Sequence, residues 1–334
     1  MSTSNPHDAL FKWTFAYPEH AAGELAAVLP AELAARIDWS ELGVVSGSFV
    51  DEDLGDRHAD LLFQAPIDGR NAFIYVLFEH QSSPDRWMAM RLLRYMVRIW
   101  ERHQQAHPEA ERLPAIVPLV LYHGEAPWSA PQAFHELLDL DHELQALCGD
   151  TLVGFRYVVD DLGRVTDESL LSRPLSPRAK VTMWALKYGR RGLDALEHVR
   201  RWSDAIRELL RREGRWALVV HLRYTLLVND DVTPSDLQET IGALGPEASE
   251  AIMTVGQQLI EQGRVEGRVE GRVEGIVSVL SQLLTRLGVS PTGDQLGRLR
   301  GQSPEVLEAL AANLLDASDP DAALALLQPH LDEG

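Results

Sequence analysis

The chain has 334 residues, of which 45% are hydrophobic and 24% are charged, and its formal net charge is −19. This length can bury a substantial core and predicts two or three domains, while the single cysteine, Cys148, excludes an intramolecular disulfide and is typical of a reducing compartment. No apolar run approaches the ~20 residues that a membrane-spanning helix needs, and the first residues lack the apolar region of a signal peptide, so we expect a cytoplasmic protein with no membrane partner.

The first predicted elements are helical. Residues 7–29 have a helical pattern that Tyr17-Pro18 divides into two helices, and a shorter helix at 31–37 follows Pro30. A first strand is expected from Val44 to Val50, and an acidic turn at 51–56 follows it.

The next segment reads as a β-hairpin. Two short apolar runs, 61–63 and 73–78, are aromatic or β-branched, and Asp68-Gly69 marks the turn between them. If Asp60 lies opposite Glu79, the tip of the hairpin is Gly69-Arg70. Pro66 also fits a wider loop, so a second register stays open.

The end of this hairpin carries polar residues suited to a metal ion. Side chains alternate along a strand, so Glu79 and Gln81 share one face while His80 points away from it, and Asp60 can join Glu79 and Gln81 from the neighbouring strand. Two carboxylates and an amide oxygen form the hard oxygen site that Mg²⁺ or another divalent cation prefers. We therefore expect Asp60 and Glu79 to be metal ligands.

A helix is predicted from Asp85 to about His103. Its arginines at 91, 94, 98 and 102 are spaced by three or four residues and so line one face, which makes Arg91, Arg94 and Arg98 candidate phosphate contacts or simply a solvated surface. An apolar run at 116–122 predicts a strand buried on both faces, and 155–159 predicts a further strand.

Beyond residue 177 the pattern is helical only. Residues 178–223 contain twelve lysines or arginines and five acids, a local charge of +7 that permits DNA binding despite the acidic total. The tail at 276–331 predicts an amphipathic helix ending at Gly288 and two shorter helices near 304–316 and 320–331.

Residues 263–274 repeat the tetrapeptide GRVE three times. On a helix this period gives separate, slowly drifting stripes of glycine, arginine, valine and glutamate. The stripes stack like charges, and each glycine costs up to about 1 kcal/mol, so a lone helix is unfavourable. A second copy of the chain would let the arginine stripe meet the glutamate stripe, which predicts a homo-oligomer contact; a flexible linker is the alternative.

Several of these motifs together resemble known nucleases. The acid at 60 and the Glu79-His80-Gln81 tripeptide resemble the PD-(D/E)xK nuclease superfamily, with Gln81 in place of the usual lysine. The chain is also similar, over roughly residues 5–230, to the Rpn family of recombination-promoting nucleases, or YhgA-like putative transposases, which carry this glutamine. The motifs that carry the resemblance stand in one order: PHDALFK (6–12), GSFVDEDL (47–54), EHQS (79–82) and VPLVLYHG (117–124).

The resemblance implies a restriction-endonuclease-like α/β core, with a mixed central sheet flanked by helices, and an all-helical C-terminal region. It implies a nuclease-like core at 5–175, a basic helical extension at 176–232 packed on that core, a helical linker at 233–275 and a small helical domain at 276–331. The implied activity is Mg²⁺-dependent cleavage of DNA that promotes recombination, with Asp60, Glu79 and Gln81 as catalytic residues. The resemblance also implies that first-helix residues such as His7, Asp8 and Lys12 line the site, while a helix N-cap is the alternative role for Asp8. Lys12 is a further candidate DNA contact.

Two other functions remain open. The missing lysine and the acidic charge also fit a DNA-binding or transposition accessory protein with a decayed site. The repeat and the helical tail also fit an oligomeric interaction protein.

Overall fold

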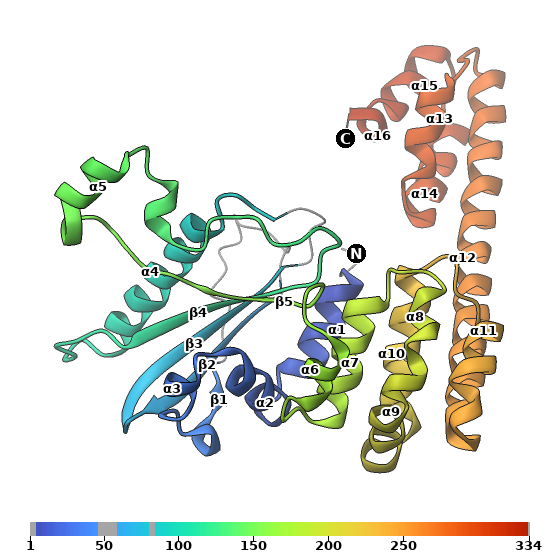
Figure 1. Cartoon of the computed structure of the whole chain (residues 1–334). Coiled ribbons are helices and arrows are strands. Elements are labelled where there is room, and N and C mark those ends of the chain that lie inside the picture. The colour runs from blue at the N-terminus through green and yellow to red at the C-terminus, as the bar shows by residue number, and fades with distance from the viewer. Residues whose placement is uncertain (1–4, 46–58, 80–83, 333–334) are drawn as a thin grey trace. The chain divides into compact units, whose positions relative to one another are not determined.

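The computed structural model describes residues 5–45, 59–79 and 84–332, which form helices and one mixed sheet (Figure 1). The chain divides into two compact units, residues 1–255 and 256–334. No helix among the described residues is long and apolar enough to cross a membrane.

The first unit contains the sheet and most of the helices. Its elements are α1 (Pro6–Phe15), α2 (Pro18–Val28), α3 (Ala31–Ala34), β1 (Gly43–Val44), β2 (Ala59–Ile67), β3 (Arg70–Glu79), α4 (Met88–Ala106), β4 (Ala115–Tyr122), α5 (His142–Cys148), β5 (Val158–Asp161), α6 (Asp167–Ser172), α7 (Pro177–Tyr188), α8 (Asp194–Glu197), α9 (Val199–Glu213), α10 (Arg215–Val228) and α11 (Pro234–Thr240), followed by the start of α12 (Pro246–Arg286). The break between α1 and α2 falls at Pro18, as predicted from the sequence.

The described part of the sheet has five strands in the order β1-β2-β3-β4-β5. The pairs β1/β2 and β2/β3 are antiparallel, whereas β3/β4 and β4/β5 are parallel. Helix α4 makes the crossover between β3 and β4, as a parallel pair requires. The predicted strand at 155–159 is corrected to Val158–Asp161, because the backbone of 155–157 pairs with 132–134 instead of β4. Phe134 N–H donates to the Phe155 carbonyl at 3.0 Å, and Tyr157 N–H donates to the Gln132 carbonyl at 3.1 Å.

The β2–β3 hairpin forms in a register two residues away from the expected one. Asp60 pairs with Leu77 instead of Glu79, and the tip is Asp68-Gly69 instead of Gly69-Arg70. Asp68 and Gly69 have φ angles of 48° and 73°, the two positive values that a type I′ turn requires. This turn twists in the same sense as the strands it joins, so it stabilises the observed register.

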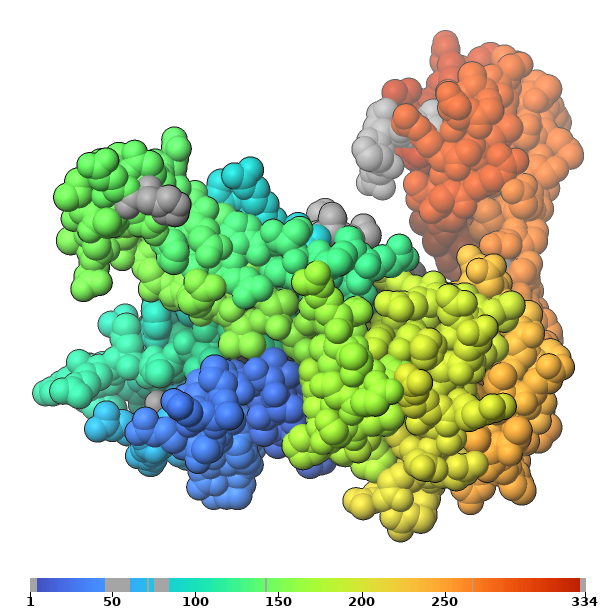
Figure 2. Space-filling view, viewed as in Figure 1, coloured from blue at the N-terminus to red at the C-terminus, as the bar shows by residue number. Residues whose placement is uncertain are grey.

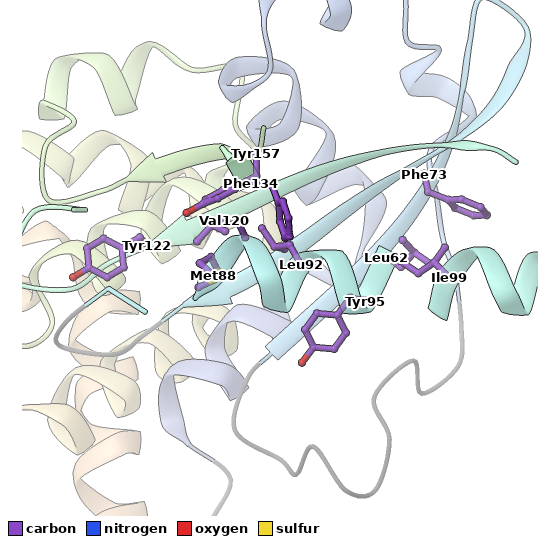
Figure 3. Packing of buried hydrophobic residues seen from close by; sticks show 11 residues of the cluster. Leu62, Phe73, Met88, Leu92, Tyr95, Ile99, Val120, Tyr122, Phe134 and Tyr157 are labelled. Carbon is purple, nitrogen blue, oxygen red and sulfur yellow. The ribbon is translucent and has the colours of Figure 1, made fainter. Parts of the chain in front are cut away.

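Helices cover both faces of the sheet. On one face Leu62, Phe73, Val120 and Tyr122 pack with Met88, Leu92, Tyr95 and Ile99 of α4 (Figure 3). On the other face Phe63, Leu119 and Leu121 line a small cavity together with Phe11 and Phe15 of α1 and Leu25 of α2. These two sets alternate along β2 and β4, which is why the strands are apolar on both sides.

The helices that follow the sheet pack against α1. A buried hydrogen-bond chain runs from Thr14 of α1 through Thr182 of α7 to His221 of α10, with distances of 2.7 and 2.9 Å. The N-terminal helices (blue) therefore lie directly against the yellow-green segment around α7 (Figure 2).

The second unit is helical throughout its described residues. It consists of α12 from residue 256 onward, α13 (Gly293–Arg300), α14 (Pro304–Leu315), α15 (Pro320–Leu327) and α16 (Pro329–Asp332). Its core is formed by Val277, Leu280 and Leu284 of α12 with Leu299, Leu307 and Leu310. The GRVE repeats lie inside α12, so their interpretation as a flexible linker is wrong.

Candidate functional site

The two predicted acidic ligands occupy neighbouring strands. Asp60 is the second residue of β2, and Glu79 is the last residue of β3, where it pairs with Tyr122 of β4. The side chains of Asp60 and Glu79, and the whole of Gln81, lie outside the described residues. The described side chains contain no group of three or more histidines, cysteines or acids that could hold a metal, so the site formed by Asp60, Glu79 and Gln81 stays a prediction.

The backbone nevertheless restricts where this site can be. Along β2 and β3, positions 60 and 79 alternate in phase with Leu62 and Phe73, whose side chains face α4. The observed register differs from the expected one by two residues, an even number, so this phase is the same in both registers. Val120 lies near the end of β4 beside Met88, the first residue of α4, whereas Leu62 lies beside Ile99 (Figure 3). Helix α4 therefore begins at the edge of the sheet where β3 ends.

The candidate DNA-contacting arginines of α4 differ in exposure. Arg94 is exposed. Arg91 is half-buried and forms an ion pair with Asp85, 3.4 Å from Nη1 to Oδ2, and Arg98 is also half-buried with a buried Nη1 atom. Lys12 is exposed on α1, which covers the opposite face of the sheet. The structure thus groups the three arginines and separates Lys12 from them.

A buried polar cluster stands directly after β4. Arg190 donates from Nε to His7 Nε2 at 3.0 Å, and His7 Nδ1 lies 2.7 Å from the Tyr224 hydroxyl. Because a guanidinium can only donate, Nε2 of His7 accepts, and its Nδ1–H donates to Tyr224. The ring of His123, the residue after Tyr122, lies 4.9 Å from the ring of His7. Burial raises the pKa of Tyr224.

No sequence pattern predicts that these four residues meet, since 217 positions separate His7 from Tyr224. His7 and His123 are 5% and 6% exposed, and they belong to the α1 face of the sheet, opposite to the phase of positions 60 and 79. The cluster joins α1 to α10 and to the segment just after α7, beside the edge where β4 ends. His7 thus lies near that edge, on the far side of the sheet from α4.

A second charged cluster surrounds Asp167 at the start of α6. Lys187 and Tyr188 donate to its Oδ1 at 2.9 and 2.5 Å, and His198 Nδ1 lies 3.3 Å from Oδ2. Burial by itself would raise the pKa of Asp167, but the hydrogen bonds from Tyr188 and Lys187 outweigh burial and hold that pKa below its usual range. This cluster ties α6 to α7 and α9.

Comparison with known proteins identifies relatives over most of the chain. The family model described as "Putative transposase, YhgA-like" matches residues 5–215. Recombination-promoting nuclease RpnD of Escherichia coli O157:H7 is 29% identical over 264 residues, which are 78% of this chain and 95% of that protein. Recombination-promoting nuclease RpnA of Escherichia coli K12 is 27% identical over 78% of this chain and 85% of its own length.

A further relative carries a different description. The inactive recombination-promoting nuclease-like protein RpnE of Escherichia coli K12 is 27% identical over 78% of this chain and 84% of its own length. No solved structure matches the chain.

Proposed function

The chain belongs to the YhgA-like putative transposase family, and on that premise we propose that it is a metal-dependent DNA endonuclease that promotes recombination. The observation that carries the proposal is the similarity, over 78% of the chain, to proteins named recombination-promoting nucleases. The proposed reaction is hydrolysis of a backbone phosphodiester bond.

The order of the elements supports a PD-(D/E)xK-type core for this activity. An N-terminal helix pair, an antiparallel hairpin, the crossover helix α4 and a parallel strand follow one another, which is the order expected for that core. A shared metal ion requires that the two acids occupy adjacent strands at positions that belong to the same face of the sheet. Positions 60 and 79 meet this backbone requirement.

We assign roles to three residues on this basis. Asp60 and Glu79 hold the metal through their carboxylates, and Gln81 orients the attacking water or completes the metal shell through its amide oxygen. A bound Mg²⁺ would lower the pKa of a water and stabilise charge on the phosphate. Arg91, Arg94 and Arg98 on α4, with Lys12 on α1, are the proposed DNA contacts.

Incubation of supercoiled plasmid with the purified full chain, with and without Mg²⁺, tests the proposal. The wild-type chain should nick the plasmid only when Mg²⁺ is present. Asp60→Ala and Glu79→Ala should abolish nicking while circular dichroism stays unchanged. Glu41→Ala, which removes an exposed acid just before β1, is the control and should nick normally. Retained nicking by Asp60→Ala would refute the assignment.

A catalytically decayed DNA-binding protein is the second candidate function. It is favoured by the relative named inactive and by the glutamine at position 81, which lacks the charge of a lysine. This candidate predicts salt-sensitive DNA binding without metal-dependent cuts, so the same plasmid assay combined with a binding titration separates the two candidates.

A third candidate is an oligomeric interaction protein that associates through residues 263–274. The repeat glycines Gly263, Gly267 and Gly271 lie on α12, where an added Cβ would meet no described atom within 4 Å other than the helix's own backbone. Packing within the unit therefore does not explain these glycines, whereas close approach of a second α12 helix would.

A further inference from the structure

The outer surface of α4 begins with an exposed aromatic residue. Trp87, which directly precedes α4, is 57% exposed. Its backbone is held in place because its N–H donates to Asp85 Oδ1 at 2.8 Å. Asp85 also forms the ion pair with Arg91, so one carboxylate anchors both the tryptophan backbone and the first arginine of the helix. The backbone of Trp87 is thus anchored, and its ring is in contact with solvent.

Trp87 continues directly into the arginine row of α4. At 100° per residue, the side chains of Trp87, Arg91, Arg94, Arg98 and Arg102 fall within ~80° of one another around the helix axis, and we call this row the α4 stripe. The stripe is ~22 Å long at 1.5 Å per residue, the length of about six nucleotide steps in a duplex. Trp87, Arg94 and Arg102 of this row are exposed, whereas Arg91 and Arg98 are half-buried where the row borders the buried face of α4.

The charge around the stripe favours an anionic partner. Residues 85–102 contain five arginines and two acids, a local net charge of +3 in a chain of net charge −19. Arg86 is one of these five arginines, and its Cζ atom lies 5.9 Å from the centre of the Trp87 ring. Arginines in a row beside an exposed aromatic ring are the combination that single-stranded nucleic acid binds, through phosphates and through base stacking.

The stripe also begins at the right place for the proposed reaction. Met88, next to Trp87, packs near the end of β4, and the neighbouring strand β3 ends at Glu79 (Figure 3). A strand lying along the stripe would therefore reach the edge that carries the proposed metal ligands at its Trp87 end. Arg94 and Arg102, the exposed arginines of the stripe, would then contact phosphates that lead away from the cleavage point.

We propose that Trp87 stacks on an unpaired base of DNA held along the α4 stripe, and that DNA with a single-stranded segment is the preferred substrate. The inference rests on the proposed function. Bases in an intact duplex are already stacked on their neighbours, so only an unpaired base can use the exposed ring fully. Stacking tolerates any base, so this contact would select strand state instead of sequence.

Binding measurements on the full-length chain test this inference. The probes are a dye-labelled oligo-dT strand and a blunt duplex of the same length, titrated in EDTA and followed by fluorescence anisotropy. Trp87→Ala should weaken binding of the single strand about tenfold, and binding of the duplex by clearly less. Trp87→Phe should retain most of the affinity, because a smaller aromatic ring still stacks.

The chain supplies a matched control in Trp216. This residue is also 57% exposed, and Arg215 Cζ also lies 5.9 Å from its ring, but it belongs to α10. Trp216→Ala should bind both probes like the wild-type chain. If Trp87→Ala matches Trp216→Ala, or loses equal affinity for both probes, the inference is overturned while the proposed endonuclease stands. A wild-type chain that neither binds DNA nor nicks plasmid overturns both.

Discussion

Arg173 and Asp160 form a two-point ion pair inside the first unit, with Nη1 to Oδ2 at 2.7 Å and Nη2 to Oδ1 at 2.9 Å. Glu24 of α2 accepts from the same Nη1 at 2.8 Å, and the three side chains are at most 10% exposed. Arg173 thereby joins α2 to β5, the last strand of the sheet. Burial and the neighbouring Asp160 raise the pKa of Glu24 well above its usual value.

Replacement of Arg173 should destabilise the first unit strongly. Arg173→Met leaves two buried carboxylates without their cation, and we expect the free energy of unfolding to fall by about 3–5 kcal/mol. All eight tryptophans lie between residues 13 and 216, so urea unfolding followed by tryptophan fluorescence reports on this unit. Arg207→Met, which removes an exposed ion pair with Asp204, is the control and should cost at most about 1 kcal/mol. Equal effects of the two variants would contradict the structural role.

The stability of the first unit should decrease in mild acid because of His221. Burial lowers the pKa of this fully buried histidine from 6.5 to about 4. Its Nδ1–H donates to the Ala217 carbonyl at 2.7 Å, so Nε2 accepts from Thr182. The folded state binds the proton less readily than the unfolded state does. The contribution of His221 to the free energy of unfolding is therefore complete above pH 6.5. It is lost as the pH falls toward 4, by about 3 kcal/mol at most.

Urea midpoints at several pH values across this window measure the effect. His221→Gln will lower stability at neutral pH by disturbing the buried chain to Thr14, but it should flatten the decline between pH 6.5 and 4 because it removes the titrating group. An unchanged slope in that variant would assign the acid sensitivity to other groups, such as His20, whose pKa burial also lowers.

Salt dependence should distinguish the proposed DNA contacts. Arg94→Ala should weaken DNA binding and reduce the slope of log affinity against log salt concentration by about one, because one phosphate contact is lost. Lys12→Ala should have a smaller effect, since α1 covers the face of the sheet opposite to α4. Binding titrations at a series of salt concentrations test both variants. A larger loss for Lys12→Ala would place the DNA on the α1 side.

The repeat glycines permit a test of self-association with two opposed readouts. Each of the two substitutions in the double variant Gly263→Ala, Gly267→Ala should stabilise the second unit by up to about 1 kcal/mol if this part of α12 is exposed. The control Gly297→Ala in α13 should stabilise it by a similar amount. If a second copy packs on the repeats, the paired substitution will also weaken self-association, whereas Gly297→Ala will not. Thermal unfolding followed by circular dichroism and mass photometry measure the two effects. An unchanged oligomeric state in both variants would end the oligomer proposal.

The sequence predicted the fold best where a local signal was strong. Pro18 separated α1 from α2, and the arginine row of α4 appeared with the expected spacing. The hairpin was predicted, but its register was wrong. The prediction placed Asp60 opposite Glu79, whereas in the structure the turn preference of Asp68-Gly69 sets the pairing. The assignment of Phe155 to β5 failed because its carbonyl accepts a hydrogen bond from Phe134 N–H, a contact between segments that no local pattern encodes.

The candidate site was predictable only in part for the same reason. A strand pattern gives the alternation of positions 60 and 79, but the packing of α4 against the sheet, and the meeting of His7 with His123, depend on how distant segments pack. The exposure of Trp87 likewise follows from the orientation of α4 on the sheet, since the sequence alone does not distinguish a buried tryptophan from an exposed one.

The two-residue turn at Asp68-Gly69 restricts how the hairpin can change length during evolution. Inserting a single residue into β2 or β3 between that turn and the acids would swap every position beyond it to the opposite face of the sheet, and so carry one acid away from the other. Insertions or deletions of two residues would keep both acids on one side. Among homologous chains, length differences in this hairpin should therefore come in even numbers wherever nuclease activity is retained, and odd ones should accumulate in the inactive members.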